Sequence, residues 1–534
     1  MNAHRLGRLV ALWVVVLAPA SHPYCHASEP VAADIVLRNG ILVDGTGAAR
    51  TTGDLAIQGD RIVAVGRFDV KGVPLTIDCT GLMIAPGFID LHNHSDEQIL
   101  KPETRANLNS LSQGCTTVVT GNCGAGPVDA AAFYEAVETH GAGTNIAHLL
   151  PQGSLRQEVV GLANRPATPE EIKAMRELAC KAMQDGVWGM STGLIYVPGS
   201  YADTDELVAI AEVVGEHGGI YASHMRDEGT QLLAAVEELL EIGRRAKLPA
   251  HASHFKSSGQ DAWGLIRQAA KMIEQAKLAG QTVTADQYPY IASSTSLLAT
   301  VIPTAARADG RDEFLKRLDD TEQGASIRAH IADVLRKKED GTAIRIARYE
   351  ERPEWVGRNL KDIAAAEGIT PLDLCMQIAR TGNAQIVNFC MSEDDVRFAM
   401  QIPWVATASD GRAAIPGTDR PHPRYYGTFA RKIGYYSLRE EVLPLEQAIY
   451  SCSGLPAEIL KLPHRGVLKP DYFADVAVLD PTTYIDTATF DDPHQYAAGV
   501  RHLLVNGTLV IHEGYPTGAL AGRALRHEPA KDCP

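Results

Sequence analysis

The sequence has little that would favour binding to a polyanion or insertion into a membrane. It carries 50 Lys and Arg residues against 65 Asp and Glu, a formal net charge of −15, and its basic residues are scattered along the chain. An acidic surface repels nucleic-acid phosphates and anionic lipid headgroups. Beyond residue 27, no run approaches the roughly 18 uninterrupted apolar residues that a membrane-spanning helix needs. We therefore expect a soluble protein that acts on small molecules and binds neither nucleic acid nor a membrane.

Other absences narrow the class of protein further. No internal repeat is visible, and no Gly-x-Ser-x-Gly elbow follows a strand-like segment, which disfavours a Ser-His-Asp hydrolase. The chain has nine cysteines, and those beyond residue 27 are widely scattered instead of closely spaced as in a small disulfide framework. At least one of these cysteines is therefore a candidate for a role other than a disulfide.

The N-terminus has the pattern of a secretory signal. His4, Arg5 and Arg8 precede an apolar run at 9–18, and small residues follow at two candidate cleavage points, the second just before Ser28. We expect residues 1–27 to be a signal peptide and the mature protein to be exported, either to the periplasm or as a secreted protein.

The two ends of the remaining chain share a β-rich pattern. Short alternating apolar runs at 35–43 and 54–66 return near the C-terminus at 474–479 and 500–510. Each piece alone is too short to bury a face, because an isolated hairpin has no core of its own. We therefore expect residues 28–86 and 465–534 to form one small β-sandwich domain.

The middle of the chain, residues 87–464, alternates short β-branched runs with amphipathic helical stretches. This rhythm predicts an α/β fold, a (β/α)₈ TIM-like barrel. The eight expected strands lie near 88–94, 116–123, 145–151, 187–192, 219–224, 249–254, 282–288 and 404–410. The long gap at about 290–400 predicts an insertion or lid before the last strand, although 385–390 is itself a possible ninth strand.

Six residues with metal-ligating side chains lie at the ends of these expected strands. They are His92, His94, Cys123, His224, His254 and Asp410. Taken singly, each has an ordinary explanation, such as a polar strand end or a buried thiol that packs as a small apolar group. In a parallel barrel, however, every strand delivers its carboxyl end to the same rim, so we expect all six to converge at one mouth.

The types of side chain indicate which ion they would hold. Two imidazoles with a thiolate suit zinc, which accepts mixed nitrogen and sulfur ligands, whereas magnesium and calcium prefer oxygen. We assign Cys123, His224 and His254 to one tight zinc site. His92 and His94, with Asp410, are candidates for a second, weaker site.

These motifs carry a family resemblance. Pro-Gly-Phe-Ile-Asp-Leu-His-Asn-His at 86–94 and Ser-Asp-Gly at 409–411 resemble the amidohydrolase superfamily. More narrowly, the chain resembles the N-acyl-D-amino-acid deacylase (D-aminoacylase) family over about residues 33–525. The motifs that carry this closer resemblance include Gly-Asn-Cys-Gly at 121–124, Ser-His-Met-Arg-Asp-Glu at 223–228, His-Phe-Lys at 254–256 and His-Pro-Arg at 422–424.

The resemblance implies an activity and a set of site residues. The activity is zinc-dependent hydrolysis of the amide bond of N-acyl-D-amino acids to a D-amino acid and a carboxylate, and the D configuration rests on the resemblance alone. Cys123 occupies the place of the carboxylated lysine that bridges two metals in hydantoinases and dihydroorotases. The residues implied to line the substrate pocket are Tyr196, Lys256, Tyr288, Ser294 and Arg424.

The expected mechanism follows from these ligands. Zinc polarises the amide carbonyl or lowers the pKa of a water molecule toward about 7, so that the water attacks the carbonyl. Asp410 accepts the proton of that water and passes it to the departing amine, which makes Asp410 the expected catalytic acid–base. Lys256 and Arg424 hold the free carboxylate of the substrate, Arg by a two-pronged contact and Lys as a point charge.

Two alternatives stay open. A cyclic-amide hydrolase of the hydantoinase or dihydroorotase type would normally need the bridging lysine, and the second expected strand contains none. An exported metal-binding or solute-binding protein could use the same pocket without turnover, and would then need no proton shuttle at Asp410. Among neighbouring residues, we assign no function to His251 and expect Asp227 and Glu228 to lie in a solvated turn or at a helix start.

Overall fold

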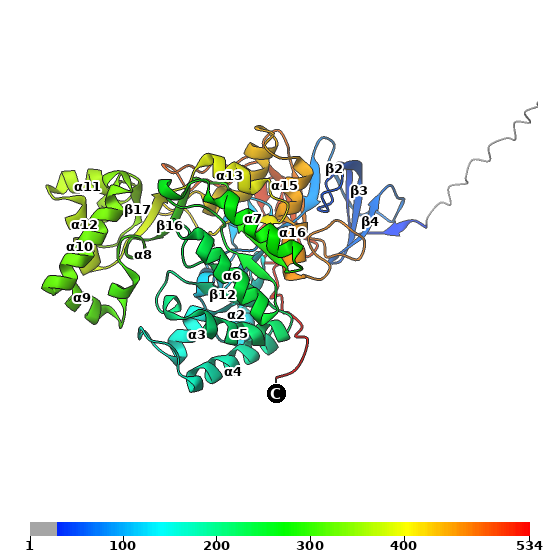
Figure 1. The fold of residues 1–534 in the computed structure, drawn as a ribbon. Coiled ribbons are helices and arrows are strands. Elements are labelled where there is room, and N and C mark those ends of the chain that lie inside the picture. Colours follow the sequence, from blue (N-terminus) through cyan, green and yellow to red (C-terminus); the bar gives the residue numbers. More distant parts are fainter. Residues whose placement is uncertain (1–28, 534) are drawn as a thin grey trace, which may run out of the picture.

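The computed structural model describes residues 29–533 and has an α/β architecture (Figure 1). The expected signal peptide, residues 1–27, lies outside the described residues. Among the helices that are described, none is both long enough and apolar enough to cross a membrane.

Parallel strands form the centre of the molecule, and a strand occurs at each of the eight expected positions. Two parallel sheets hold them, one in the order β10–β9–β8 and the other in the order β11–β12–β13–β14–β15–β19. Their bounds are β8 (Phe88–Asp90), β9 (Cys115–Thr120), β10 (Asn145–His148), β11 (Leu150–Pro151), β12 (Gly189–Gly193), β13 (Ile220–His224), β14 (Ala250–Ala252), β15 (Val283–Gln287) and β19 (Val405–Thr407). The third expected strand is thus divided at Leu149 into β10 and β11, which pair with different neighbours.

Hydrogen bonds join the segments that follow the first and last of these strands. The Asp410 amide donates to the His92 carbonyl oxygen at 2.8 Å, and the His94 amide donates to the Gly411 carbonyl oxygen at 2.7 Å. Behind them, the buried carboxylate of Asp90 accepts hydrogen bonds from the amide and the hydroxyl of Ser409. The two segments that carry His92, His94 and Asp410 therefore lie side by side.

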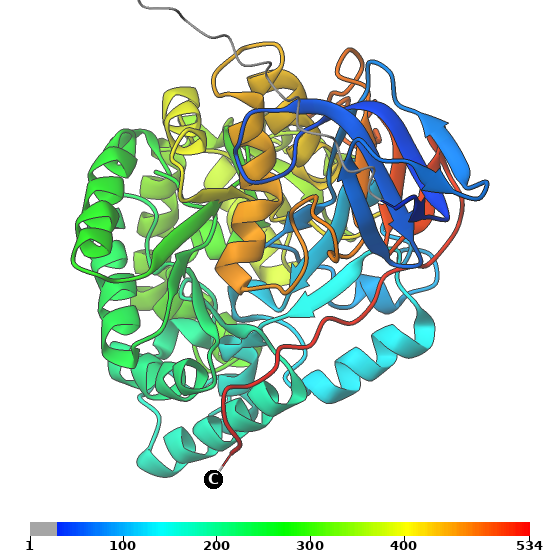
Figure 2. The ribbon, with the colours of Figure 1, turned by 90° about the vertical axis from the view of Figure 1, so that its right-hand side faces the viewer.

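Amphipathic helices cover the outer face of these strands (Figure 2). The main ones are α2 (Ala130–His140), α4 (Pro169–Asp185), α5 (Thr204–Glu216), α6 (Leu232–Ala246), α7 (Leu265–Leu278) and α13 (Glu393–Met400). In α6, Leu232, Val236 and Leu239 are buried while Glu237 is exposed, which is the spacing of a helix with one apolar face. A capping box between Thr168 and Glu171 begins α4.

Both ends of the described chain contribute to one nine-stranded sheet. The strands are β2 (Ile35–Leu42), β3 (Thr51–Gln58), β4 (Arg61–Gly66), β6 (Leu75–Asp78), β7 (Met83–Pro86), β20 (Val476–Leu479), β21 (Val500–Val505), β22 (Thr508–His512) and β23 (Tyr515–Pro516). The join between the two ends is the antiparallel pair β7–β20. The sheet branches at β2, because β6 pairs with the first half of that strand and β7 with its second half. The strands that were expected to form a sandwich thus belong to one hydrogen-bonded sheet.

The segment before β19 forms a body with its own core, on the left in Figure 1. It consists of an antiparallel sheet in the order β16–β18–β17 and five α-helices around it. Their bounds are β16 (Ala292–Ser296), β17 (Ile344–Arg348), β18 (Gln385–Phe389), α8 (Leu297–Val301), α9 (Arg311–Asp319), α10 (Thr321–Arg336), α11 (Leu360–Glu367) and α12 (Pro371–Thr381). The possible ninth strand at 385–390 is therefore β18, which pairs with this sheet and with none of the parallel strands.

The C-terminal tail runs back across the helices and is fastened there, as the red trace in Figure 2 shows. A disulfide joins Cys180 of α4 to Cys533, a sequence separation of 353 residues. The indole of Trp188 also donates a hydrogen bond to the Leu525 carbonyl oxygen at 2.7 Å. This long-range pairing was not anticipated from the cysteine spacing.

Candidate metal-dependent active site

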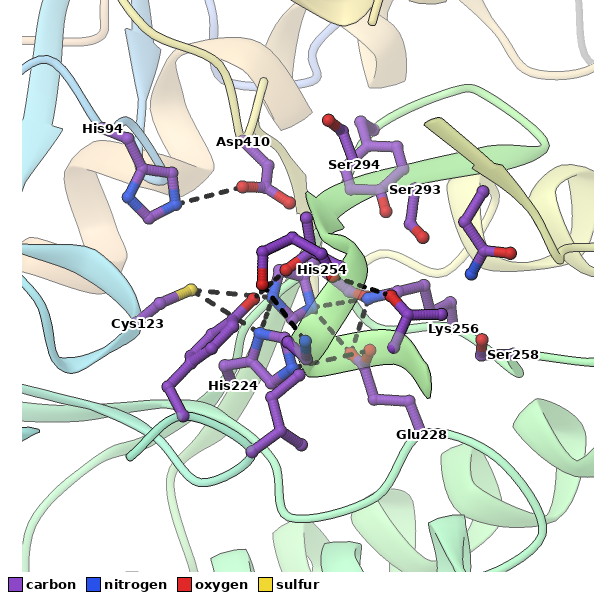
Figure 3. Close-up of a pocket in the computed structure, with 18 of the residues that line it drawn as sticks. His94, Cys123, His224, Glu228, His254, Lys256, Ser258, Ser293, Ser294 and Asp410 are labelled. Atoms are coloured by element: carbon purple, nitrogen blue, oxygen red, sulfur yellow. Dashed lines mark hydrogen bonds and ion pairs between the residues drawn. The ribbon is translucent and has the colours of Figure 1, made fainter. Parts of the chain in front are cut away.

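A cavity of about 590 Å³ opens at the carboxyl ends of the parallel strands, between them and the segment that contains β16 and β18 (Figure 3). Five of the six expected metal ligands line it, namely His94, Cys123, His224, His254 and Asp410. The sixth, His92, is fully buried behind them. Residues from five separate strand ends thus meet in one place.

Three of these residues have a strained backbone. Cys123 (φ 53°), His254 (φ 37°) and Asp410 (φ 48°) all adopt positive φ angles, which residues with a Cβ rarely do. Hydrogen bonds hold two of them: the His254 amide donates to Oδ1 of Asp286 at 2.7 Å, and the Asp410 amide donates to the His92 carbonyl oxygen. Strain of this kind persists where the surroundings fix a side chain in a particular direction.

The thiol of Cys123 lies at the centre of the cluster. Its Sγ is 3.7 Å from Nδ1 of His224 and 3.8 Å from Nε2 of His254. Ligands of a tetrahedral zinc ion, with bonds of about 2.0–2.3 Å, stand roughly 3.3–3.6 Å apart, so the two sulfur–nitrogen distances suit a shared ion. The two imidazole nitrogens are only 2.8 Å apart and would separate slightly around one.

The other three expected ligands are adjacent. Oδ1 of Asp410 lies 3.1 Å from Nε2 of His94 and 3.6 Å from Nε2 of His92. Nε2 of His92 is also 3.2 Å from Sγ of Cys123, closer to the sulfur than His224 or His254 is. The two expected metal sites are therefore contiguous, with the sulfur and His92 between them.

Electrostatics favours the ionised forms of the thiol and the carboxylate. Burial alone would raise the pKa of Cys123, but the charge of His92 and hydrogen bonds from His224 and His254 outweigh it and hold that pKa well below the usual value. Burial likewise opposes ionisation of Asp410, yet the charges of Arg424 and His92 keep the pKa of Asp410 well below its ordinary range.

Glu228 is a site residue that the sequence analysis missed. It was expected in a solvated turn, but its side chain is only 11% exposed, and its Oε1 lies 2.7 Å from Nδ1 of His254 and 2.5 Å from Nζ of Lys256. Burial alone would raise the pKa of Glu228, but the positive charges of Lys256 and His254 outweigh this effect and lower that pKa. The expectation was wrong because a run of charged residues after a strand is normally solvated, whereas here a lysine from the next strand end neutralises the carboxylate. The only feature of the sequence that could have identified Glu228 as a site residue is its position four residues after His224.

A second buried carboxylate, Asp286 of β15, supports the cluster from behind. Its Oδ2 lies 2.9 Å from Nε2 of His251 and 3.5 Å from Nδ1 of His92, while its Oδ1 accepts the His254 amide. A carboxylate that contacts the outer nitrogen of a ligating histidine orients the ring. His251, to which no function was assigned, does not line the cavity; its Nε2 contacts Asp286 and its Nδ1 contacts Oγ1 of Thr284.

The expected substrate-binding residues all line the cavity, and two of them offer buried donors. Nη1 of Arg424 forms an ion pair with Oδ2 of Asp410 at 2.8 Å, but neither Nη1 nor Nε makes a hydrogen bond among residues 29–533. The hydroxyl of buried Tyr288 likewise has none within that range, and the Arg424 guanidinium lies 4.6 Å from its ring centroid. Donors left unpaired at a cavity wall suit an anionic ligand.

The other three expected substrate-binding residues already make hydrogen bonds within the protein. Nζ of Lys256 donates to Glu228 and to the His254 carbonyl oxygen. The hydroxyl of Tyr196 is 3.0 Å from Oγ1 of Thr295, and its ring meets that of His224 edge-on with centroids 5.1 Å apart. The hydroxyl of Ser294 donates to the Ile386 carbonyl oxygen at 2.8 Å. A ligand would reach these groups by sharing or displacing existing contacts.

Comparison with known proteins places this geometry in a family. The model of the amidohydrolase family matches residues 75–511. A D-aminoacylase from Alcaligenes xylosoxydans xylosoxydans is 36% identical over 93% of this chain and 98% of its own. An N-acyl-D-aspartate deacylase from the same organism is 36% identical over 92% of this chain and 94% of its own.

A solved structure extends the comparison to three dimensions. The N-acyl-D-glutamate deacylase from Bordetella bronchiseptica, in complex with zinc and a phosphonate that mimics the tetrahedral intermediate, has a TM-score of 0.80 and 32% identity, covering 93% of this chain and 100% of its own. Together with the match over more than half of the sequence, these similarities show that the chain belongs to the amidohydrolase family and, within it, groups with the D-aminoacylases.

Proposed function

We propose that this protein is a metal-dependent hydrolase that cleaves the linear amide bond of N-acyl-D-amino acids, releasing a D-amino acid and a carboxylate. The observation that carries the proposal is the convergence of Cys123, His224 and His254 beside Asp410 in one cavity. Relatives that match nearly the whole chain support the proposal, because they are named D-aminoacylase and N-acyl-D-aspartate deacylase.

Zinc is the proposed cofactor. Sulfur and imidazole nitrogen at the observed spacings form a suitable donor set, and Cys123, His224 and His254 would hold the tighter ion. His92, His94 and Asp410 would hold a second, weaker one. Bound zinc supplies positive charge that polarises a carbonyl and acidifies water.

Asp410 is the proposed general acid–base. Its pKa lies well below the usual range, so its carboxylate is ionised at neutral pH, which is the form that a general base requires. Its Oδ1 faces His94 and its Oδ2 faces Arg424, so both oxygens have a fixed direction at the cavity wall. The same carboxylate would return the proton to the amine as that group departs.

We propose that Arg424, Tyr288 and Lys256 bind the free carboxylate of the substrate. Arg424 and Tyr288 contribute the two unpaired donors, and Lys256 contributes a positive charge that it shares with Glu228. Tyr196 and Ser294 would border the bound molecule, Tyr196 from the strand side and Ser294 from β16. Arg424 is itself oriented by His422, whose Nδ1 accepts the Arg424 amide at 3.0 Å.

The proposed architecture follows from the same strands. We infer a (β/α)₈ barrel over residues 87–464 with an insertion at about 290–400, and a small β domain from residues 28–86 and 465–534. The parallel strand order and the hydrogen bonds from His94 and Asp410 across the first and last strand ends support a closed barrel. The continuous pairing through β7 and β20 supports the β domain.

Export is proposed on separate grounds. Disulfides persist in oxidising compartments and are rare in the cytosol, so the Cys180–Cys533 disulfide supports the periplasmic or secreted destination expected from the N-terminal sequence. N-terminal sequencing of the mature protein tests this, and a start far from Ser28 would contradict it.

One assay tests the proposed activity. Amine release is measured from paired N-acetyl-D- and N-acetyl-L-amino acids, before and after chelation and after zinc is added back. The proposal predicts hydrolysis of D substrates only, its loss on chelation and its return with zinc. No hydrolysis of any D substrate by the zinc-loaded protein would contradict it, and cleavage of cyclic amides instead would favour a hydantoinase-like activity.

A further inference from the structure

The charges that line the cavity do not balance, and this bears on which N-acyl-D-amino acids fit it. Five lining side chains are cationic: Arg226, Lys256, Lys338, Arg412 and Arg424. The anionic side chains are fewer: the carboxylates of Asp227, Glu228 and Asp410, and the thiolate of Cys123. A bound zinc ion would add further positive charge.

Three of the cations already have an acidic partner. Lys256 pairs with Glu228 at 2.5 Å, and Arg424 pairs with Asp410 at 2.8 Å. Arg226 pairs with Glu238 of α6 at 2.9 Å and also donates to the carbonyl oxygens of Ser200 and Ala202. Each of these three cations is thus already neutralised by a carboxylate.

The other two cations, Lys338 and Arg412, have no acidic partner within the described part of the chain. Both are half-buried, and the Arg412 guanidinium lies 5.7 Å from the ring centroid of Tyr425. The remaining lining acid, Asp227, accepts hydrogen bonds from the amides of Gly229 and Gln231. Unpaired, partly desolvated cations at a cavity wall favour an anion over a neutral group.

One wall of the cavity is polar. The side chains that β16, α8 and β18 contribute there are Ser293, Ser294, Thr295, Ser296, Ala299, Thr300, Gln385 and Asn388, of which only alanine is apolar. Asn388 is 6% exposed, and its Oδ1 has no hydrogen-bond partner in the described range. An aliphatic group bound against this wall would remove water from polar groups without replacing their hydrogen bonds, which costs free energy.

We propose that the preferred substrates are N-acyl-D-amino acids with a second carboxylate, which the unpaired cations Lys338 and Arg412 attract into the cavity. The inference rests on the proposed deacylase activity, in which Arg424 and Tyr288 receive the α-carboxylate. The second carboxylate belongs either to an acidic side chain or to a dicarboxylic acyl group, since both present the same anion to the cavity.

The experiment uses substrate pairs that differ in charge and little in shape. N-acetyl-D-glutamate against N-acetyl-D-glutamine tests an acidic side chain, and N-succinyl-D-alanine against N-succinamoyl-D-alanine tests an acidic acyl group. The proposal predicts that kcat/KM is higher for the charged member of at least one pair, by about tenfold or more, with most of the difference in KM.

Variants then assign that preference to the two cations. Lys338→Met and Arg412→Met should each reduce the charged-to-neutral ratio, and the double variant should bring it close to one. Lys338→Gln is a second, polar variant in case the methionine disturbs folding. Lys337→Met is the matched control, because Lys337 is exposed, pairs with Asp333 and does not line the cavity, so its ratio should equal that of the unchanged protein.

The possible failures are distinct. Ratios near one in both pairs would overturn the inference while leaving the deacylase activity standing. So would an equal loss on both members of the preferred pair when Lys338 or Arg412 is replaced, because that cation would then bind the shared α-carboxylate. Hydrolysis of no substrate at all would overturn the proposed function, and the inference with it.

Discussion

Oε1 of Glu228 lies 2.7 Å from Nδ1 of His254. The same oxygen is 2.5 Å from Nζ of Lys256, so one largely buried carboxylate contacts both a candidate zinc ligand and a candidate substrate-binding residue. Carboxylates in this position fix the ring orientation of a ligating histidine and raise its basicity. Metal affinity and substrate binding are therefore expected to depend together on Glu228.

Replacing Glu228 with Gln keeps the shape of the side chain but removes its charge. We expect zinc affinity to fall about 10- to 100-fold, because the imidazole of His254 becomes less basic. KM should also rise, because Lys256 loses the ion pair that fixes the position of its ammonium group. Competition with a zinc-binding dye measures the first effect and steady-state kinetics the second. Glu237→Gln, on the exposed face of α6, is the control. An unchanged zinc affinity would show that Glu228 does not orient His254.

Replacing Asp410 with Asn should separate catalysis from binding at the tighter site. The amide cannot take up a proton at neutral pH, so kcat should fall by about 10²- to 10⁴-fold while one zinc ion per chain is retained. Kinetics together with metal analysis checks this. Asp419→Asn, which changes an aspartate outside the cavity, should leave both unchanged. A variant that keeps its kcat would remove Asp410 from the proposed proton transfer.

The positions of the strand ends could be predicted from the sequence because each is a short apolar run that stops at a chemically distinctive residue. His224 is the last residue of β13, and Cys123, His254 and Asp410 each follow a strand by two or three residues. Their meeting place could also be predicted, because parallel strands carry their carboxyl ends to one edge.

The features that could not be predicted involve residues that are far apart in the sequence and in contact in the structure. The carboxylate of Glu228 is largely withdrawn from solvent, and the charges that compensate it there come from Lys256 and His254, at the next strand end, and from His224. Cys180 and Cys533 are 353 residues apart, and nothing local to either one identifies the other. Likewise, the pairing of β18 with β16 and β17 depends on the separate core of the insertion, which includes Trp355 and gives no local sequence signal.

The disulfide gives a prediction about stability. Replacing Cys533 with Ser should lower the free energy of unfolding by about 2–4 kcal/mol, because the unfolded chain regains freedom that the long covalent loop removes. Urea denaturation of the non-reduced protein measures this. A dithiol reductant should destabilise the original protein to the level of the variant and leave the variant unaffected. If reductant does not change the original protein, the disulfide does not stabilise it.

Lys432 gives a prediction about pH. It is buried in the π-helix η8 (Arg431–Ser437), its Nζ donates to the Met400 carbonyl oxygen, and burial lowers its pKa to about 8. The unfolded chain, with a lysine pKa of about 10.4, holds this proton more tightly, so stability should rise with pH between these two values. Below pH 8 both states are protonated, and the folded state bears the full cost of the buried charge.

Lys432→Met should therefore stabilise the protein at pH 7 by about 2 kcal/mol, after allowing for the lost hydrogen bond. That gain should shrink as the pH approaches about 10.4. Thermal unfolding at both pH values checks this, with exposed Lys271→Met as the matched control. A variant less stable than the original protein by the same amount at both pH values would contradict the account.

The account depends most on the sulfur of Cys123 as a zinc ligand, and zinc K-edge X-ray absorption of the protein loaded with one equivalent of zinc tests this directly. The account predicts one sulfur scatterer at about 2.3 Å beside nitrogen ligands at about 2.0–2.1 Å. In Cys123→Ser the sulfur signal should disappear along with the activity. A spectrum of nitrogen and oxygen ligands alone in the active, zinc-loaded protein would contradict the proposed metal site.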